Sequence, residues 1–282
     1  MSTGTIARAD VGHRRAAAVG EFRPATFADA VRAEWLKFRT MRATVINALA
    51  TPVLGMAYAV MFGLSGARDY LEATPADQAA FDPGGVAMRS LVLAQITAAL
   101  VGALMVTVEY RSRSMATTVT AVPRRTRLLA AKTLVVTAVM LVVGQITAFG
   151  TFLVGTSVLA GQGVPSLTLA DPGAIGPVAG AGLYLGTLPV LGIAVGTLLR
   201  VSAGAVATLG VGLLLIPAMA PIYPEWLAEP VMKYWPTLAG YRLSAFVPDP
   251  DLPSGWQGYL LMCGFLAVLS AVTVYVFRRR DV

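Results

Sequence analysis

Six segments of the sequence, each about 20 residues long, are rich in apolar side chains and almost free of charge. A helix of that length spans the apolar core of a bilayer, which is roughly 30 Å thick. Charged residues make up only 13% of the 282 residues, whereas a soluble domain has about 25%. The sequence therefore predicts an all-α, polytopic membrane protein. Its six expected transmembrane helices cover residues 44–64, 88–109, 134–159, 175–199, 203–220 and 257–277.

The distribution of Lys and Arg residues predicts the topology of these helices. Of the 22 Lys and Arg residues, only Arg68, Arg89, Lys233 and Arg242 fall on one side of the membrane, and most of the 15 acidic residues share that side. Because cytoplasmic segments carry the excess of positive charge, we expect both termini of this plasma-membrane protein in the cytoplasm. The same rule explains the net charge of +7 without a nucleic-acid partner.

The chain before the first span divides into two parts. Residues 1–25 are polar, lack the apolar core of a signal peptide, and are expected to form a disordered cytoplasmic tail. Residues 26–43 begin with a possible capping pair, Thr26 and Asp29. Apolar residues follow at helical spacing, and charged residues occupy the remaining faces, which predicts an interfacial amphipathic helix. Its apolar face comprises Phe27, Val31, Trp35 and Phe38. This helix either anchors the chain in the membrane or also contacts a cytoplasmic partner.

We expect the transmembrane domain to cover residues 44–277 and to precede a short cytoplasmic tail at 278–282. Within this domain, the connection between the second and third spans is the most strongly charged segment. Its first charge, Glu109, is the only acidic residue in or directly bordering a span. A helix C-terminus does not favour an anion, so a partner such as Arg111 or Arg113 is expected. The sequence leaves a structural or coupling role, a proton relay and simple solvation as alternatives for Glu109.

Two further patterns lie in the second half of the chain. Residues 221–256 are rich in proline and aromatic residues, which predicts a re-entrant or surface-lying helical segment at the outer membrane boundary. Its candidate gate residues are Tyr223, Trp226, Trp235 and Tyr241. The fourth span repeats a small-xxx-small spacing with the pairs Gly176 and Gly180, Gly182 and Gly186, and Gly192 and Gly196. Such spacing serves close helix packing, either within one subunit or at a subunit interface or moving contact.

The sequence lacks the motifs of a catalytic chain. It contains no phosphate-binding GxxxxGK[ST] loop, no HExxH and no GxSxG. One cysteine, Cys263, and one histidine, His13, do not suffice for a metal site. No span carries the paired carboxylates that proton-coupled transporters use. We therefore expect no catalytic residue, metal or cofactor in this chain, and an active transporter built from it would need an external energy source.

Two stretches resemble the ABC-2 type permeases, the membrane subunits of actinobacterial ABC exporters. Residues 33–44, AEWLKFRTMRAT, are similar to the segment that opens many of these permeases. Residues 109–111, Thr118, residues 121–125 and Lys132 resemble their first cytoplasmic loop. The resemblance covers most of the chain, because the six spans and the irregular outer segment follow in the same order.

The resemblance implies a set of partners and a role. Two permease subunits, identical or paralogous, would pair in the lipid bilayer, and each would dock on a separate ATPase subunit that binds ATP and Mg. The loop after the second span would be the coupling helix, at residues 115–120, and substrate would pass along the second and fifth spans. The implied coupling residues are Glu109, Tyr110, Arg111, Met115, Thr117, Thr118, Pro123, Arg124, Arg125 and Arg127.

The expected activity is ATP-driven export of a hydrophobic or amphipathic substrate, such as a drug or antibiotic, a peptide or a lipid-like molecule. Two alternatives remain at the level of the sequence. One is a self-sufficient secondary transporter or channel. The other is a non-transporting membrane protein, such as an immunity or sensor subunit.

Overall fold

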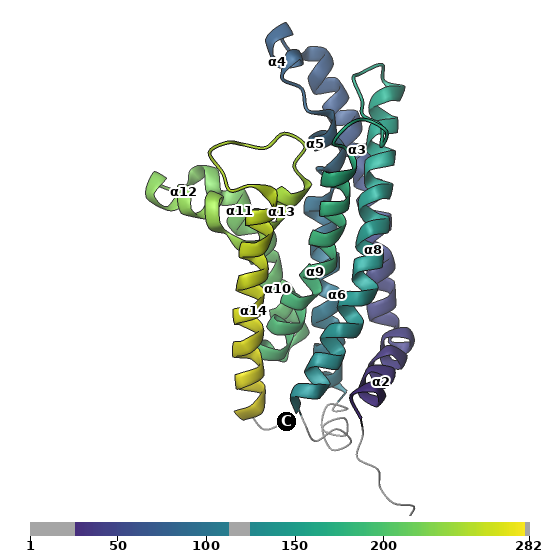
Figure 1. The fold of residues 1–282 in the computed structure, drawn as a ribbon, viewed down its shortest axis with the longest axis vertical. Coiled ribbons are helices and arrows are strands. Elements are labelled where there is room, and N and C mark those ends of the chain that lie inside the picture. The colour runs from purple at the N-terminus through teal and green to yellow at the C-terminus, as the bar shows by residue number, and fades with distance from the viewer. Residues whose placement is uncertain (1–25, 113–124, 280–282) are drawn as a thin grey trace, which may run out of the picture.

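The computed structural model describes residues 26–112 and 125–279, which form helices and short connections and contain no strand. Six helices in these ranges are long and apolar enough to cross a membrane, as the sequence predicts. They are α3 (Arg42–Glu72), the pair α5 (Pro83–Met88) and α6 (Leu91–Arg111), α8 (Arg125–Gly161), α9 (Ile175–Leu199), the fifth span with α10 (Ser202–Gly210) and α11 (Ile216–Met219), and α14 (Gly255–Arg279). All run roughly along the long axis of the molecule (Figure 1).

Several helices extend beyond the expected spans. Helix α3 continues to Glu72 and α8 begins at Arg125, because a helix satisfies its own backbone hydrogen bonds in water as well as in lipid. Residues 66–87, which lie between the first two expected spans, are therefore not a simple loop. The end of α3, the short helix α4 (Pro75–Ala79) and α5 occupy most of that range, and the Thr74 and Asp82 side chains cap the two short helices.

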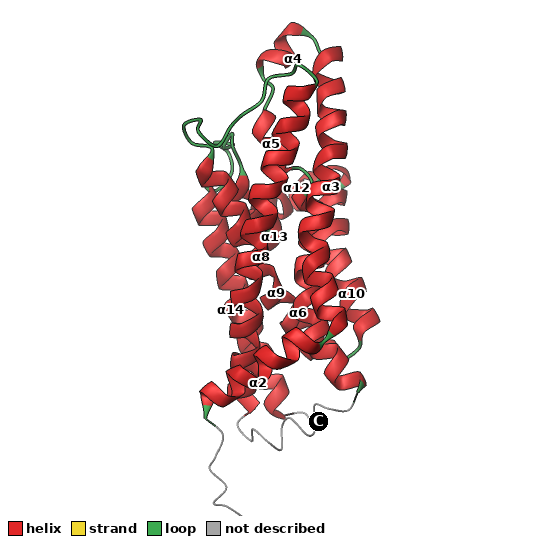
Figure 2. Cartoon of the chain, turned by 90° about the vertical axis from the view of Figure 1, so that its right-hand side faces the viewer, coloured by secondary structure: helices red, strands yellow, loops and turns green. Residues whose placement is uncertain are grey.

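Helices α6 and α9 form the centre of the bundle. In their most apolar stretches, 61% and 67% of the residues are buried, against 22% in α3, in the fifth span and in α14. Helices α3 and α8 pack along one side of this central pair, and the fifth span and α14 lie on the other (Figure 1). The short helix α2 (Phe27–Thr40) lies at the end of the bundle opposite α4 (Figure 2). The last turn of α14 reaches the same end as α2.

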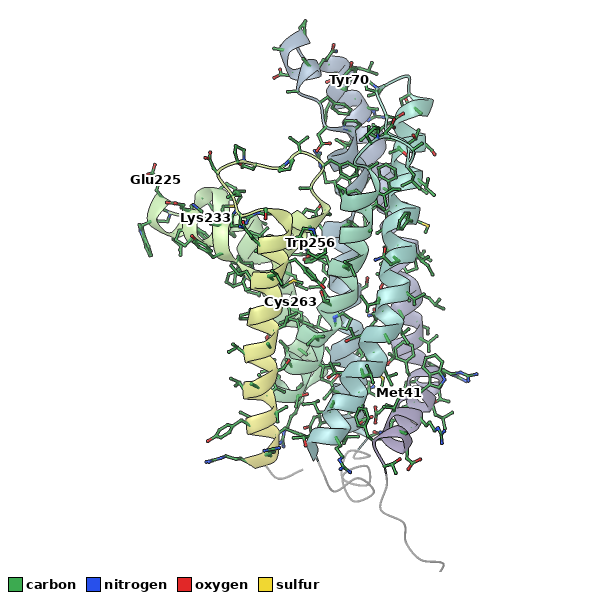
Figure 3. The ribbon with its side chains drawn as sticks, in the orientation of Figure 1. Met41, Tyr70, Glu225, Lys233, Trp256 and Cys263 are labelled. Atoms are coloured by element: carbon green, nitrogen blue, oxygen red, sulfur yellow. The ribbon has the colours of Figure 1, made fainter. Side chains whose placement is uncertain are left out.

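The segment between the last two spans begins with short helices and is partly exposed. It contains α12 (Glu225–Tyr234) and α13 (Pro236–Tyr241), and α12 projects sideways from the bundle, with Glu225 near its free end (Figure 3). Of the four candidate gate residues, Trp226 is 75% exposed and Tyr223 is half-buried. Trp235 and Tyr241 point back into the bundle, where they donate hydrogen bonds to the carbonyls of Gly212 and Met88. A gating role for these residues stays a prediction.

Cysteine Cys263 lies in α14 (Figure 3). It is free and half-buried.

The glycines of α9 serve packing within this chain. A Cβ atom added to Gly192 would lie 1.9 Å from the carbonyl oxygen of Ala99 in α6, so the two backbones touch directly. A Cβ added to Gly102 of α6 would likewise lie 2.0 Å from the carbonyl oxygen of Pro189. Every glycine of the three predicted pairs except Gly176 faces a neighbouring segment of the same chain.

This packing predicts opposite outcomes for two substitutions in α9. Gly192→Ala should lower the thermal unfolding midpoint of the purified protein, because its Cβ meets backbone that cannot rotate away; overpacking of this kind costs about 1–3 kcal/mol. Gly176→Ala should leave the midpoint unchanged or slightly raised, because nothing lies within 4 Å of the added atom. Equal midpoints for the two variants would contradict the close approach of α6 and α9.

Candidate functional site

Four charged side chains from three helices meet at the end of the bundle that holds α2. Glu34 and Lys37 come from α2, Glu109 from the last turn of α6, and Lys132 from α8. The Lys132 ammonium lies 2.6 Å from Glu34 Oε2 and 2.8 Å from Glu109 Oε1. The Lys37 ammonium lies 2.8 Å from Glu34 Oε1 and 3.1 Å from Glu109 Oε1. We call these four residues the charged cluster.

The charged cluster is buried and electrically balanced. Glu34, Glu109 and Lys132 are 0%, 3% and 1% exposed, and Lys37 is half-buried. Two carboxylates face two ammonium groups, so no net charge is removed from water. Lys132 also donates to the carbonyl oxygen of Met105 at 3.1 Å, which gives each of its three ammonium hydrogens an acceptor. Such complete pairing is what makes a buried charge tolerable.

The sequence of α2 explains why Glu34 and Lys37 lie together in the charged cluster. Thr26 and Asp29 form the predicted capping box, in which each side chain accepts a hydrogen bond from the other residue's backbone amide. The helix that follows places Glu34 and Lys37 three residues apart, on one face. Glu34 and Lys37 lie outside the expected apolar face of this helix, yet both turn toward the bundle, where Glu34 bonds to Lys132 of α8 and Lys37 bonds to Glu109 of α6.

The apolar residues of α2 are divided between two environments. Phe27 and Trp35 are 42% and 45% exposed, as lipid-facing aromatics would be. Phe38 is buried in the core, and Val31 packs against that core. The helix is thus held to the bundle by apolar contacts as well as by its ion pairs.

The charge of Lys37 is stable at neutral pH. Burial acts to lower the pKa of its ammonium group, but the carboxylates of Glu34 and Glu109 outweigh burial and raise that pKa above its ordinary value of 10.5. A raised pKa means that the folded state favours the protonated form. Lys37 therefore contributes stability at all pH values below about 10.5, and that contribution is lost as the pH rises through its higher folded pKa.

Glu109 has partners other than those expected from its neighbours in the sequence. Arg111 is exposed, and Arg113 lies outside the described residues. Lys37 and Lys132, which are 72 and 23 positions away, pair with the carboxylate instead. The second oxygen of Glu109, Oε2, is buried and accepts no hydrogen bond from any residue in the described ranges.

The remaining coupling residues fall into two groups. Tyr110 is half-buried, and the Arg200 guanidinium lies 5.1 Å from the centre of its ring, which joins the end of α6 to the turn between α9 and α10. Arg127 is half-buried in the first turn of α8, which begins at Arg125. Met115, Thr117, Thr118, Pro123 and Arg124 lie outside the described residues.

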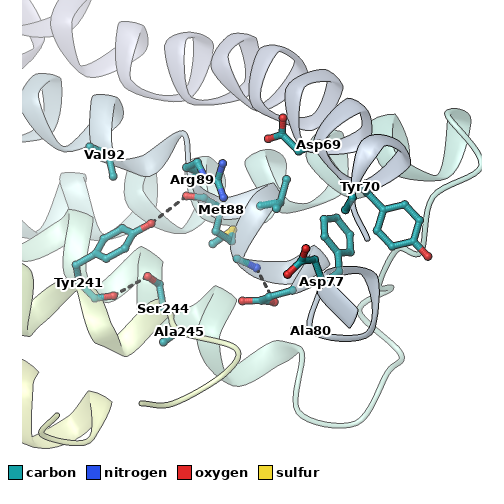
Figure 4. A pocket seen from close by; sticks show the side chains of 16 residues that line it. Asp69, Tyr70, Asp77, Ala80, Met88, Arg89, Val92, Tyr241, Ser244 and Ala245 are labelled. Carbon is teal, nitrogen blue, oxygen red and sulfur yellow. Dashed lines mark hydrogen bonds between the residues drawn. The ribbon is translucent and has the colours of Figure 1, made fainter. Parts of the chain in front are cut away.

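The opposite end of the molecule holds a cavity of about 670 Å³ between α3, α4, α5 and the 241–245 segment (Figure 4). Asp69, Asp77, Asp82 and Arg89 line it, together with Tyr70 and other residues. Within the residues the structure describes, no group of three or more potential metal ligands comes together.

The charged cluster predicts a non-additive response to substitution. Lys132→Met leaves two buried carboxylates facing one lysine, and removing one partner of a buried ion pair costs roughly 3–5 kcal/mol. The double variant Lys132→Met, Glu109→Gln removes one charge of each sign, so its unfolding midpoint should lie above that of Lys132→Met alone. The exposed pair of Arg32 and Asp29, 4.0 Å apart, supplies the control.

Arg32→Ala should change the midpoint little, because exposed ion pairs contribute at most about 1 kcal/mol. A double variant that is less stable than Lys132→Met would show that the four charges do not act as a balanced set.

The chain also matches a known protein family. Residues 30–218, from α2 to the fifth span, match the model of the ABC-2 family transporter proteins. No curated protein matches the chain. The matched range contains all four residues of the charged cluster and exceeds half of the chain. The chain therefore belongs to the ABC-2 transporter family and is the membrane permease of an ABC transporter system.

Proposed function

We propose that this permease is the membrane subunit of an ATP-driven exporter whose ATP is hydrolysed by a separate ABC ATPase. Two permease chains, identical or paralogous, would pair in the plasma membrane, and each would dock on one ATPase subunit that holds ATP and Mg. Family membership supports an ATPase partner. The outward direction of transport and the composition of the complex are part of the proposal.

The observation that carries the proposal is the position of the charged cluster. Glu109 lies just before the segment 113–124, and Lys132 lies shortly after it. Glu109 and Lys132 form an ion pair with each other. Lys132 also pairs with Glu34 of α2, and Glu109 also pairs with Lys37 of α2. A displacement of the 113–124 segment by a docked ATPase would therefore reach α2, α6 and α8 together rather than one helix alone.

Charge supports a cytoplasmic location for this end of the molecule. Arg111 is exposed at the end of α6, and Arg127 is accessible near the start of α8. By the positive-inside rule, the excess of Lys and Arg in the segments expected at this end supports a cytoplasmic location. A basic surface next to the coupling segment suits an acidic surface of an ATPase.

The substrate class follows from the apolar walls of the bundle. A cavity of about 620 Å³ lies between α9, the fifth span and α14, and nearly all of its lining is apolar, with Leu198, Leu213, Trp235 and Phe265 among the contributors. Such walls suit a hydrophobic or amphipathic molecule, for example a drug or antibiotic, an apolar peptide or a lipid-like compound.

The proposed docking surface predicts a charge-dependent complex. Tagged permease should co-purify with the ATPase encoded beside it, and the double variant Arg111→Glu, Arg127→Glu should lose most of that ATPase. Arg68→Glu is the control, because Arg68 is an exposed arginine like Arg111 but lies near the end of α3 remote from α2. Equal loss in both variants, or retention in both, would contradict docking at this surface.

Export itself is tested by efflux of a lipophilic fluorescent dye from energised cells. Cells that contain permease and ATPase should lose the dye faster than cells with permease alone, and the difference should survive collapse of the proton gradient while ATP is maintained. With a secondary transporter, efflux would not depend on the ATPase and would be lost when the proton gradient collapses. Equal efflux with and without the ATPase would refute the proposal.

A further inference from the structure

The fifth span changes its hydrogen-bond pattern in the middle of the bundle. Residues Val211–Leu215 form a π-helical segment between α10 and α11. The amide of Ile216 bonds to the carbonyl of Val211 instead of its usual acceptor, Gly212. Pro217 has no amide hydrogen, so the carbonyl of Leu213 also loses its usual donor. Two consecutive carbonyls are therefore released from the regular helical pattern.

Side chains from two other elements bind these two carbonyls. Gln95 Nε2 of α6 donates to the carbonyl oxygen of Leu213 at 3.2 Å, and Trp235 Nε1 donates to that of Gly212 at 2.8 Å. Gln95 is only 5% exposed, and its own oxygen accepts a 2.5 Å hydrogen bond from the buried hydroxyl of Tyr184 in α9. A carbonyl without a hydrogen bond is unfavourable in the apolar core of a membrane, which explains why donors are present at these two positions.

Helix α6 connects this site to the charged cluster. Gln95 and Glu109 lie 14 residues apart on the same helix, or about 21 Å at 1.5 Å per residue. A second polar contact joins α6 to the fifth span, because Ser202 Oγ donates to Thr107 Oγ1 at 2.9 Å. Movement of α6 at its cluster end would thus act on the fifth span at two points, the start of α10 and the π-helical segment.

We propose that Gln95 and Trp235 are positioning residues that hold the fifth span in its π-helical form, and that residues 211–217 are the hinge at which movement of α6 bends this span. The inference rests on the proposed function for the origin of the movement. Two backbone hydrogen bonds of a regular helix are already missing at this hinge, because the carbonyls of Gly212 and Leu213 are bonded to side-chain donors instead.

The geometry of the hinge is tested on the purified chain without any ATPase. Pro217→Ala restores an amide hydrogen that can bond the released carbonyls. Gln95→Leu should lower the unfolding midpoint in the natural background by more than the roughly 2–4 °C expected for one hydrogen bond, because it removes the bonds of Gln95 to Val92 and Tyr184 as well as the bond to Leu213. In the Pro217→Ala background, Gln95→Leu should lower the unfolding midpoint clearly less. The loss of Tyr184's acceptor is common to both backgrounds and cancels.

Gln145 provides the matched control. Its Nε2 donates to the carbonyl of Ala179 at 3.1 Å, across α8 and α9 and away from Pro217. Gln145→Leu should lower the midpoint by the same amount in both backgrounds. If Gln95→Leu also lowers the midpoint by the same amount in both backgrounds, Gln95 does not substitute for the missing amide of Pro217, and the proposed hinge geometry is overturned.

The movement is tested in the complete complex with its ATPase. Spin labels at Val206 and Ile222, both exposed and on opposite sides of the hinge, should change separation between the nucleotide-free and ATP-bound states. Pro217→Ala or Trp235→Phe should reduce that change. An unchanged separation in a complex that binds and hydrolyses ATP would overturn the hinge. Failure of the ATPase to bind would instead refute the proposed function, and the stability cycle would still report on the hinge geometry.

Discussion

The buried ion pairs of the charged cluster are the interaction on which the α2 end of this permease depends. Lys132 alone contacts Glu34 of α2, Glu109 of α6 and the backbone of α6 at Met105. Taking charges out of water is costly, and the cost is offset only while every partner stays in place. A small displacement of one helix would leave a buried charge unpaired. The cluster therefore favours joint movement of the three helices over sliding between them.

Helix α6 contributes residues to both sites of the proposed mechanism, the charged cluster and the hinge. Its last turn belongs to the charged cluster, and its middle binds the fifth span through Gln95. Between these points it packs against α9 with direct backbone contact at Gly102 and Gly192, which leaves no space for adjustable side chains. Such packing transmits displacement rather than absorbing it. The proposed hinge lies in the fifth span, where Pro217 interrupts the regular hydrogen bonds.

Much of this fold could be predicted from the sequence. The apolar segments indicated six spans because membrane helices need a fixed length, and Thr26 with Asp29 indicated the start of α2. Glu109 could be recognised as unusual, but its partners could not, because Lys37 and Lys132 are brought to it by tertiary packing. The i,i+3 pair of Glu34 and Lys37 was the one available signal, and it resembles an ordinary solvated pair. The π-helical segment could not be predicted either, because Pro217 alone does not indicate which donors will bind the released carbonyls.

The central claim, that α2, α6 and α8 move as one body when ATP binds, is tested most directly by spin-label distances in the intact complex with Cys263→Ser. One pair of labels at the exposed positions Leu36 and Leu134 reports on α2 against α8. A second pair at Leu36 and Val206 reports on α2 against the fifth span. The account predicts that ATP binding changes the second distance and leaves the first unchanged. A change in the first distance would show that the charged cluster opens, and would contradict the account.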